Sequence, residues 1–511
     1  MESTDEKAKE NAWKEDDNKR SIRAFCDNTS LHGARFLNDK NIVVRLFWFL
    51  VLVSAFGICG YQVYWTIYEY NLSPFTTTIT REKARTIEFP AVTICNLNSI
   101  SKRQYVKAAK AGGTNQTDQE LEMEIQSAMA TMQFQGSENT SAEMHLEQRL
   151  NNSESYHQRG GWMASILESY SHKIEDMLSL DWLGPCLWRG VKCSADNFTS
   201  LISLKIGQCF TFNSGKYGHP GLNSTIPGPT NGLRLRLNVE ESDHVSNSQS
   251  LISGFKVSIQ PRDEYPLVEE FGFALQPGTH TFVALRERKI KNLPKPYRTN
   301  CSSPDLSFAK TYNSSYSVFA CMGQCFTEYV VEVCHCQPLF KTISSRIEVC
   351  SMKETFECIF PKLFGRLSEK VAECSYNCPE PCNYSKYEVK LSYASAIANS
   401  FTRNLEALIL SKTDEEKLQP FINMSVKERQ EYLSNNVVSL DVYFEEIGYD
   451  LVEQQPAITS TTLLGTIGGY LGLFLGMSVL TMLEFVDLLL LWVFKSLRNK
   501  TTRVDITSST H

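Results

Sequence analysis

The sequence has few of the residues from which catalytic and metal sites are built. Only nine histidines occur in 511 residues, and their positions have neither the spacing of metal ligands nor that of a catalytic triad. The chain also has no phosphate-binding loop, no nucleophile elbow and no HExxH pair. We therefore expect no enzymatic activity, no bound metal and no cofactor, and a membrane-tethered hydrolase is disfavoured for the same reason.

A strong net charge is missing as well. Lysine and arginine number 51 against 57 aspartate and glutamate residues, which gives a net charge of −6. A chain with this balance offers no basic surface for nucleic acid. We also expect no signal peptide, because residues 1–40 are strongly charged and far longer than the basic region that begins such a peptide.

Two apolar runs interrupt this polar sequence. The first, residues 46–64 (LFWFLVLVSAFGICGYQVY), has no charge, and the second covers residues 463–494 and contains only the two charges Glu484 and Asp487. At 1.5 Å of rise per residue, the first is just long enough to cross ~30 Å of hydrocarbon, and the second is longer than necessary. We expect transmembrane helices over residues 45–66 and 461–494.

Basic residues lie on the outer flanks of both runs. They precede the first run at Lys19, Arg20, Arg23, Arg35, Lys40 and Arg45, and they follow the second at Lys495, Arg498, Lys500 and Arg503. The positive-inside rule then puts both termini in the cytosol. We expect a plasma-membrane protein with a cytosolic N-terminal arm (residues 1–44), an extracellular domain (67–460) and a cytosolic tail (495–511).

The cysteines agree with this topology. Of the sixteen, Cys26 falls in the arm, Cys59 falls in the first run, and the other fourteen lie between the runs. An even number of cysteines outside the cell favours disulfides. Zinc is the alternative for Cys334-His335-Cys336 and for the series at 374, 378 and 382, but an oxidising compartment disfavours it.

Glycosylation sequons occur in the same region. Ten Asn-x-Ser/Thr sites lie between the runs, and some of them will have arisen by chance in a chain rich in serine and asparagine. They are Asn71, Asn115, Asn139, Asn151, Asn197, Asn223, Asn300, Asn313, Asn383 and Asn423.

The extracellular region is predicted to be α+β. The segments GQCFTFN, NGLRLRLNVE, SGFKVSIQ and HTFVALRE alternate polar and apolar residues between glycine and proline turns, as strands do. Residues 101–180 are polar, with helical patches, and VVSLDVYFEEI is a strand that leads toward the second run. We expect a mainly antiparallel sheet with helical excursions.

The second apolar run carries polar chemistry. Gly468, Gly472 and Gly476 recur every four residues, which lets membrane helices approach closely. Glu484 and Asp487 share one helix face, where repetition by subunit symmetry would form acidic rings that concentrate cations. The plainer alternative puts both carboxylates at the membrane edge beside Lys495. Between these features, Gly476-Met477-Ser478 could break the helix and offer oxygens to an ion.

These residues and several motifs together resemble the degenerin, epithelial sodium channel and acid-sensing ion channel family. The motifs occur in family order: His32-Gly33, FPAVTICNLN (Phe89 to Asn98), GFALQPGTHTFV (Gly272 to Val283), the cysteine-rich block, and LLGTIGGYLGLFLGMSVLTMLEFVD with its Gly-x-Ser. The resemblance implies a homotrimer or heterotrimer that conducts Na⁺ in preference to K⁺ and is blocked by amiloride. It also implies an ectodomain shaped like a hand, with palm, knuckle, finger, thumb and β-ball.

The resemblance also assigns residues to roles. It implies a selectivity constriction at Gly476, Met477 and Ser478, with Gly472 above it and Glu484 and Asp487 at the inner mouth. It implies that His32 and Gly33 influence gating, and that Tyr297 touches Tyr68 or Tyr70 and so couples the ectodomain to the pore. The disulfides it implies are Cys95–Cys209, Cys186–Cys193, Cys301–Cys382, Cys321–Cys378, Cys325–Cys374, Cys334–Cys358 and Cys336–Cys350.

The opening stimulus is predicted to be an extracellular FMRFamide-like neuropeptide. Acid-sensing relatives carry two thumb aspartates where this chain has Phe360 and Phe364, and the histidines that follow their first span are missing from YNLSPFTTT. Another departure is Thr466, which replaces a pore aspartate. An aromatic thumb suits an amphipathic ligand, and Phe134, Trp162 and Tyr170 are further pocket candidates. The alternative is a proton- or bile-acid-modulated sodium channel of the same family.

Two other classes share the two-span layout. One is the ATP-gated trimeric channels, which have ten ectodomain cysteines rather than fourteen and a differently built pore. The other is a non-conducting adhesion or receptor protein, which the Gly-x-Ser and the acidic pair in the second run disfavour.

Overall fold

The computed structural model describes residues 26–27, 29–111, 117, 168–180, 184–203, 206–216, 220–245, 252–338, 343, 346–359, 369–370, 372–398, 400–402, 421, 424–487, 489–490 and 493. The chain forms two compact units. The first consists of Met1–Thr76, Pro296–Arg298 and Gln455–His511, and the second of Thr77–Lys295 and Thr299–Gln454.

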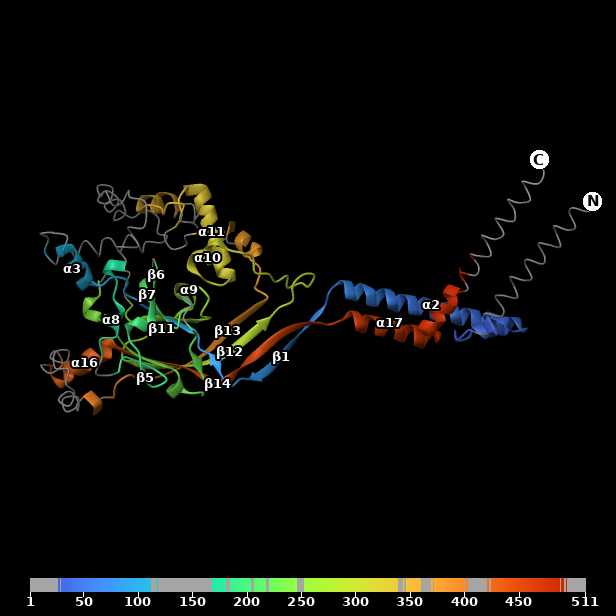
Figure 1. Cartoon of the computed structure of the whole chain (residues 1–511), viewed down its shortest axis with the longest axis horizontal. Helices are drawn as coiled ribbons and strands as arrows, with labels where there is room; N and C mark the ends of the chain where they lie inside the picture. The colour runs from blue at the N-terminus through green and yellow to red at the C-terminus, as the bar shows by residue number, and fades with distance from the viewer. Residues whose placement is uncertain are drawn as a thin grey trace, which may run out of the picture. The chain divides into compact units, whose positions relative to one another are not determined.

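The first unit is helical. It contains η1 (Ala34–Asn38), α2 (Ile42–Asn71), α17 (Ser460–Leu475) and the helix Val479–Asp487. α2 begins at Asn41, whose side-chain oxygen accepts a hydrogen bond from the Val43 N–H at 3.0 Å. Its 30 residues make it about 45 Å long, so it is longer than the predicted span over residues 45–66. α17 lies beside α2 (Figure 1).

Two helical features of this unit have the length and composition of membrane spans. α2 has them on its own, and α17 has them only when taken together with Val479–Asp487 as one bent span. Most large apolar side chains of α2 are exposed, among them Phe47, Leu50 and Phe56. Exposure of so much apolar surface suits contact with lipid.

The larger sheet of the second unit has seven strands. Its order is β13 (Asn383–Ser395), β12 (Thr279–Lys291), β14 (Val437–Pro456), β9 (Leu233–Asn238), β4 (Cys186–Trp188) and β5 (Val191–Lys192), and β1 (Phe75–Lys83) also pairs with β14. β12 and β13 pair antiparallel along their whole lengths. β12 and β14 run parallel, whereas β14 and β9 are antiparallel, so the sheet is mixed.

A second sheet packs against this one. It has the order β11 (Phe273–Leu275), β10 (Phe255–Gln260), β3 (Ala91–Asn96), β7 (Gly207–Phe212) and β6 (Phe198–Ser203), and β2 (Ile87–Glu88) pairs separately with β8 (Asn223–Ser224). Buried Phe212 and Phe255 from this sheet share one apolar cluster with Leu235, Val283 and Phe444 from the larger sheet. The main core of the unit therefore lies between the two sheets.

Short helices surround the sheets. They are α3 (Lys102–Ala111), α8 (Ile174–Met177), η3 (Ala195–Asn197), η5 (Pro229–Asn231), η6 (Glu241–Asp243), α9 (Val268–Phe271), α10 (Ser307–Tyr312), α11 (Val318–Cys334), α12 (Met352–Glu354), η7 (Thr355–Ile359) and α16 (Val426–Asn436). α11 begins where the Ser317 hydroxyl accepts from the Ala320 N–H at 3.1 Å. It ends at His335, which has a left-handed backbone.

Seven disulfides brace the second unit, and they are the seven pairs that the family resemblance implies. They are Cys95–Cys209, Cys186–Cys193, Cys301–Cys382, Cys321–Cys378, Cys325–Cys374, Cys334–Cys358 and Cys336–Cys350. Three of them start from α11, at Cys321, Cys325 and Cys334. The segment from 301 to 382, the thumb, is therefore cross-linked along its length.

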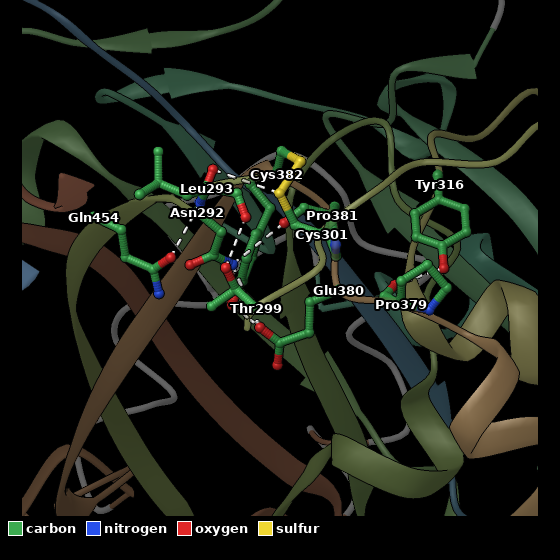
Figure 2. Close-up of a disulfide and its surroundings, with 11 residues drawn as sticks. Asn292, Leu293, Thr299, Cys301, Tyr316, Pro379, Glu380, Pro381, Cys382 and Gln454 are labelled. Carbon is green, nitrogen blue, oxygen red and sulfur yellow. Dashed lines mark hydrogen bonds between the residues drawn. A yellow bond between two sulfur atoms is a disulfide. The ribbon is translucent and has the colours of Figure 1, made fainter. Parts of the chain in front are cut away.

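The thumb joins the larger sheet at the disulfide Cys301–Cys382, which Figure 2 shows with its surroundings. Directly after β12, the Asn292 N–H donates to the Cys382 carbonyl at 2.7 Å. The Tyr316 hydroxyl donates to the Pro379 carbonyl at 2.6 Å and so closes the base of the thumb. The ends of β12 and β13 are thus held to the thumb by a covalent bond and by hydrogen bonds.

The strands expected from alternation are present, as β7, β9, β10 and β12. Several strands were not predicted, among them β1 and β13. Eight of the nine residues of β1 are exposed and show no apolar period, and both faces of the C-terminal half of β13 are exposed. β14 extends nine residues beyond the predicted VVSLDVYFEEI strand, which ends at Ile447, with its last residue at Pro456.

Removing Cys301–Cys382 should destabilise the second unit more than removing Cys186–Cys193. The first bond spans 81 residues and the second spans 7. Chain-entropy arguments then favour the first by about 1–2 kcal/mol, allowing for the bonds nested inside it. We expect Cys301→Ser/Cys382→Ser to lower the thermal midpoint of the full-length protein in detergent more than Cys186→Ser/Cys193→Ser does. Equal midpoints for the two variants would contradict this account of the thumb base.

Candidate functional site

The second apolar run is broken in the structure. α17 ends at Leu475, residues 476–478 are not helical, and Val479–Asp487 continues at 73° to α17. At such a break, the last carbonyls of one helix and the first N–H groups of the next lose their partners within the helix. Inside a membrane, these groups need partners from the protein or from a water-filled cavity. We call residues 476–478 the break.

Gly476 occupies a position that accepts only glycine. Its φ of 64° is in the left-handed region, and its N–H donates to the Gly472 carbonyl at 2.9 Å, which ends α17. A β-carbon at this position would also overlap the imidazole of His32. Both the backbone conformation and the close packing therefore require the missing side chain.

The N-terminal arm lies against the break. The His32 N–H donates to the Leu475 carbonyl at 3.0 Å and so satisfies one of the carbonyls at the end of α17. The Ser30 hydroxyl contacts the Thr481 hydroxyl, and the Thr29 hydroxyl donates to Glu484 Oε2 at 3.2 Å. We call residues 29–33 the arm segment. It supplies polar partners on both sides of the break.

Gly33 fixes the other side of the arm segment. Its φ is 85°, and a β-carbon there would lie 2.8 Å from Cε3 of Trp48 on α2. The ring of Trp48 stacks on Phe36 with 4.6 Å between the centroids. The His32-Gly33 pair therefore requires its glycine for packing against α2, while its histidine lies on Gly476.

Ser478 begins the helix after the break. Its hydroxyl accepts from the Thr481 N–H at 3.3 Å, and the Thr481 hydroxyl in turn accepts from the Ser478 N–H at 3.1 Å. This reciprocal pattern is a capping box in which threonine takes the place of the usual glutamate. The serine oxygen, predicted to face an ion, is thus partly engaged in capping the helix.

The remaining predicted residues of the ion pathway lie on open faces of this single chain. Gly472 is exposed, and only the Met477 carbonyl, at 4.0 Å, would come near a β-carbon there. At Gly468, one turn earlier, nothing within the chain comes within 4 Å of such an atom. Glu484 and Asp487 are both exposed on the helix after the break. Apart from the bond of Glu484 to the Thr29 hydroxyl, these exposed faces are open to neighbouring subunits or water.

A half-buried carboxyl group lies in the second unit, far along the sequence from these residues. Burial raises the pKa of Glu264 to about 7, the charge of Asp263 adds to this rise, and the ammonium of Lys386 opposes it. The loop that carries Glu264 docks on α10 through Tyr265, whose ring lies 5.2 Å from that of Phe308 and 5.0 Å from that of Tyr312 between centroids. Just after α10, the Ser315 N–H donates to the Asp263 carbonyl at 2.6 Å. Two tyrosines of β13, Tyr384 and Tyr387, are also within electrostatic reach of Glu264.

A second polar cluster surrounds His172. Its Nδ1 lies 3.1 Å from Glu240 Oε2 and 3.9 Å from Asp243 Oδ2, and these three side chains could together hold a metal ion. The guanidinium of Arg103, however, already lies 2.8 Å from Glu240 Oε1. It supplies the positive charge that the two carboxylates need, and so we assign no metal to this cluster.

Comparison with known proteins identifies the family. Over residues 25–488 the chain matches the sequence model of the family described as amiloride-sensitive sodium channel. It is 30% identical to acid-sensing ion channel 2 of Homo sapiens over 477 residues, which cover 91% of this chain and 85% of that protein. Acid-sensing ion channel 1 of Gallus gallus is 29% identical, with 91% and 83% covered. The chain belongs to the amiloride-sensitive sodium channel family.

Two further matches are more distant. Acid-sensing ion channel 4-B of Danio rerio is 27% identical, with 94% of this chain and 76% of that protein covered. A cryo-EM structure of a proton-activated chloride channel matches 89% of this chain and 100% of its own, but a TM-score of 0.30 and 6% identity are too low to bear on the fold. The relatives within the sodium channel family are ion channels rather than enzymes.

The coupling contact that the family resemblance implies stays a prediction. Tyr297 groups with the helical unit, because Pro296–Arg298 belongs to it. The Tyr68 ring contacts Tyr64 and Trp65 of its own helix, at 6.5 and 5.7 Å between centroids. Among the described ring contacts, none joins Tyr297 to Tyr68 or Tyr70.

The predicted peptide pocket is represented in the described residues by Tyr170 alone. Its ring packs on Tyr105 of α3 at 5.0 Å, beside a small apolar cluster. This contact is ordinary core packing. Phe134, Trp162, Phe360 and Phe364 lie outside the described residues.

The glycosylation sequons also lie partly inside and partly outside the described residues. Six lie in the described part of the chain, and the asparagine of each is exposed: Asn71, Asn197, Asn223, Asn300, Asn313 and Asn383. Asn115, Asn139, Asn151 and Asn423 lie outside it. Exposure is what a glycan requires, and use of each site stays a prediction.

Sequence reasoning missed two groups of residues. One is the hydroxyl set Thr29, Ser30 and Thr481. The pattern Ser-x-x-Thr, which follows Gly476-Met477, was the available signal that a helix starts at Ser478. The other is Glu264, for which local sequence carries no signal, because its burial depends on α10 and β13.

Substitution of Gly476 by alanine should disrupt the break. The left-handed backbone alone costs a side chain about 1–2 kcal/mol, and the overlap with His32 adds to that cost. We expect Gly476→Ala to lower the thermal midpoint of the detergent-solubilised protein and to reduce or abolish current.

Gly60→Ala in α2 is the matched control. A β-carbon there meets nothing within 4 Å, and alanine favours helix over glycine by about 1 kcal/mol. The Gly60 variant should match or exceed the wild-type midpoint. If Gly476→Ala did the same, the close fit of His32 against the break would be wrong.

Proposed function

We propose that this chain is a subunit of a trimeric, sodium-selective, amiloride-sensitive channel of the plasma membrane, with both termini cytosolic and with opening controlled by extracellular protons. The observation that carries the pore assignment is the broken apolar helix. Its Gly-Met-Ser break is closed by a cytosolic arm in a chain of the sodium channel family. A broken helix supplies backbone oxygens at membrane depth, and such oxygens can replace part of an ion's hydration shell.

Two features support a multimeric pathway. The glycine face of α17 is bare within one chain, which suits close approach of neighbouring helices. Glu484 and Asp487 would then form acidic rings at the inner mouth. Three copies would give each ring three carboxylates, enough to concentrate cations.

Protons are favoured over a peptide as the stimulus. The relatives found by comparison are named for sensing acid, and Glu264 has a pKa of about 7. Below that pH its carboxyl is neutral, and its repulsion with Asp263 ends. Because Phe360 and Phe364 replace the two thumb aspartates of acid-sensing relatives, we assign the proton response to the Glu264 loop.

The conductance can be measured in oocytes that express only this chain, under voltage clamp. We expect a step from pH 7.4 to about 5 to evoke an inward current that reverses near the sodium potential and is blocked by amiloride. Replacement of external Na⁺ by K⁺ should reduce it. Current with amidated peptides but not with acid would restore the peptide as stimulus, and no current with any stimulus would count against a homomeric channel.

Charge substitutions around Glu264 should move the pH of half-activation in opposite directions. Asp263→Asn removes a charge that raises the pKa of Glu264, so activation should need a more acidic solution. Lys386→Gln removes a charge that lowers this pKa, so activation should begin at a more alkaline pH. We expect shifts of roughly half a pH unit each, read from current against pH.

Lys390→Gln is the matched control, because this lysine is on the same strand but pairs with Glu445. It should leave the midpoint unchanged. Glu264→Gln should flatten the response near pH 7, because glutamine is neutral at every pH. If Asp263→Asn and Lys386→Gln moved the midpoint in the same direction, Glu264 would not be the sensor.

A further inference from the structure

The Thr481 hydroxyl is the most connected side-chain group at the break. Its side chain is fully buried, at 0% exposure. Its Oγ1 lies 3.1 Å from the Ser478 nitrogen and 3.2 Å from the Ser478 oxygen, and it also contacts the Ser30 oxygen. Threonine in a helix commonly bonds a carbonyl one turn earlier, whereas these partners lie at the break and on the arm segment.

These contacts use the whole capacity of the hydroxyl. A threonine hydroxyl has one hydrogen to donate and two lone pairs that accept. The Ser478 N–H can only donate, so it takes one lone pair, and the two serine hydroxyls take the remaining lone pair and the hydrogen. A side chain without the hydroxyl would leave the Ser478 N–H and the Ser30 hydroxyl without this protein partner at a part-buried contact.

Thr481 acts on the break from one side while His32 acts from the other. Through the capping box it fixes Ser478, the last residue of the break. Through Ser30 it holds the arm segment, whose His32 N–H bonds the Leu475 carbonyl before the break. The arm segment therefore bridges the two helix ends, and Thr481 is its attachment on the cytosolic side.

We propose that Thr481 is a positioning residue of the ion pathway, whose hydroxyl orients Ser478 and fastens the arm segment across the break, so that it sets Na⁺/K⁺ selectivity. This inference rests on the proposed function, since it assumes that ions pass at the break. In this proposal the Thr481 side chain does not itself contact the ion.

The test compares two substitutions at one position. Thr481→Val keeps the branched shape and removes the hydroxyl, while Thr481→Ser keeps the hydroxyl and removes the methyl group. We expect Thr481→Val to lower the Na⁺/K⁺ permeability ratio by about fivefold, the factor that corresponds to the net worth of one hydrogen bond. Thr481→Ser should retain the wild-type ratio. Reversal potentials in Na⁺ and K⁺ solutions give the ratio, and surface biotinylation gives the number of subunits delivered.

Ser30→Ala provides an independent test. It removes the arm contact and leaves the capping box intact, so it tests the attachment even if Thr481→Val fails to reach the surface. We expect Ser30→Ala to lower the ratio in the same direction. The double variant should be no worse than Thr481→Val alone, because both changes break one shared contact.

The outcomes separate this inference from the proposed function. If the wild-type chain conducts Na⁺ selectively and neither Thr481→Val nor Ser30→Ala alters the ratio at normal surface levels, the inference is overturned and the channel function stands. If Thr481→Ser loses selectivity as Thr481→Val does, the methyl group rather than the hydroxyl matters, and the inference is also overturned. A wild-type chain that carries no Na⁺ current overturns both.

Discussion

The hydrogen bond from the His32 N–H to the Leu475 carbonyl is the contact on which the helical unit depends. A helix that stops inside a membrane leaves backbone groups that lipid cannot satisfy. Here the arm segment provides the missing partner, and Gly476 and Gly33 let it approach closely enough to do so. The His-Gly motif and the Gly-Met-Ser motif, separated by more than 400 residues, are thus two halves of one packing arrangement. Gly476 is required because His32 lies against it, and Gly33 is required because Trp48 of α2 lies against it.

Contacts between segments distant in sequence also hold the second unit together. Disulfides cross-link the thumb, and the base of the thumb is tied to β12 and β13 by Cys301–Cys382 and its hydrogen bonds (Figure 2). The Glu264 loop docks on α10 within this braced region. A carboxyl group held at such a place has few ways to relax when it gains or loses charge. In the proposed proton response, its protonation would therefore act on the contact between the loop, the thumb and β13.

The sequence predicted the parts of this structure that repeat a simple period or match a family motif. β7, β9 and β10 were found because their apolar residues alternate, and the disulfide pairs came from the resemblance, since spacing alone leaves many connectivities open. β1 and β13 were missed because their residues are mostly exposed and no face is apolar. The Ser30–Thr481 contact spans 451 residues, and the burial of Glu264 comes from elements far along the chain. Neither the Ser30–Thr481 contact nor the environment of Glu264 can be predicted from local sequence pattern.

The bend at residues 476–478 also gives the channel an adjustable hydrophobic length. α17 and the helix after it have 16 and 9 residues, so they are about 24 and 14 Å long, and neither alone spans ~30 Å of hydrocarbon. Their combined reach across the bilayer depends on the angle between them. A thicker or thinner bilayer therefore acts on that angle through hydrophobic mismatch. For the proposed pore, lipid thickness and the arm contact would thus compete for the same few backbone torsions, which would make the composition of the surrounding bilayer a physical input to permeation.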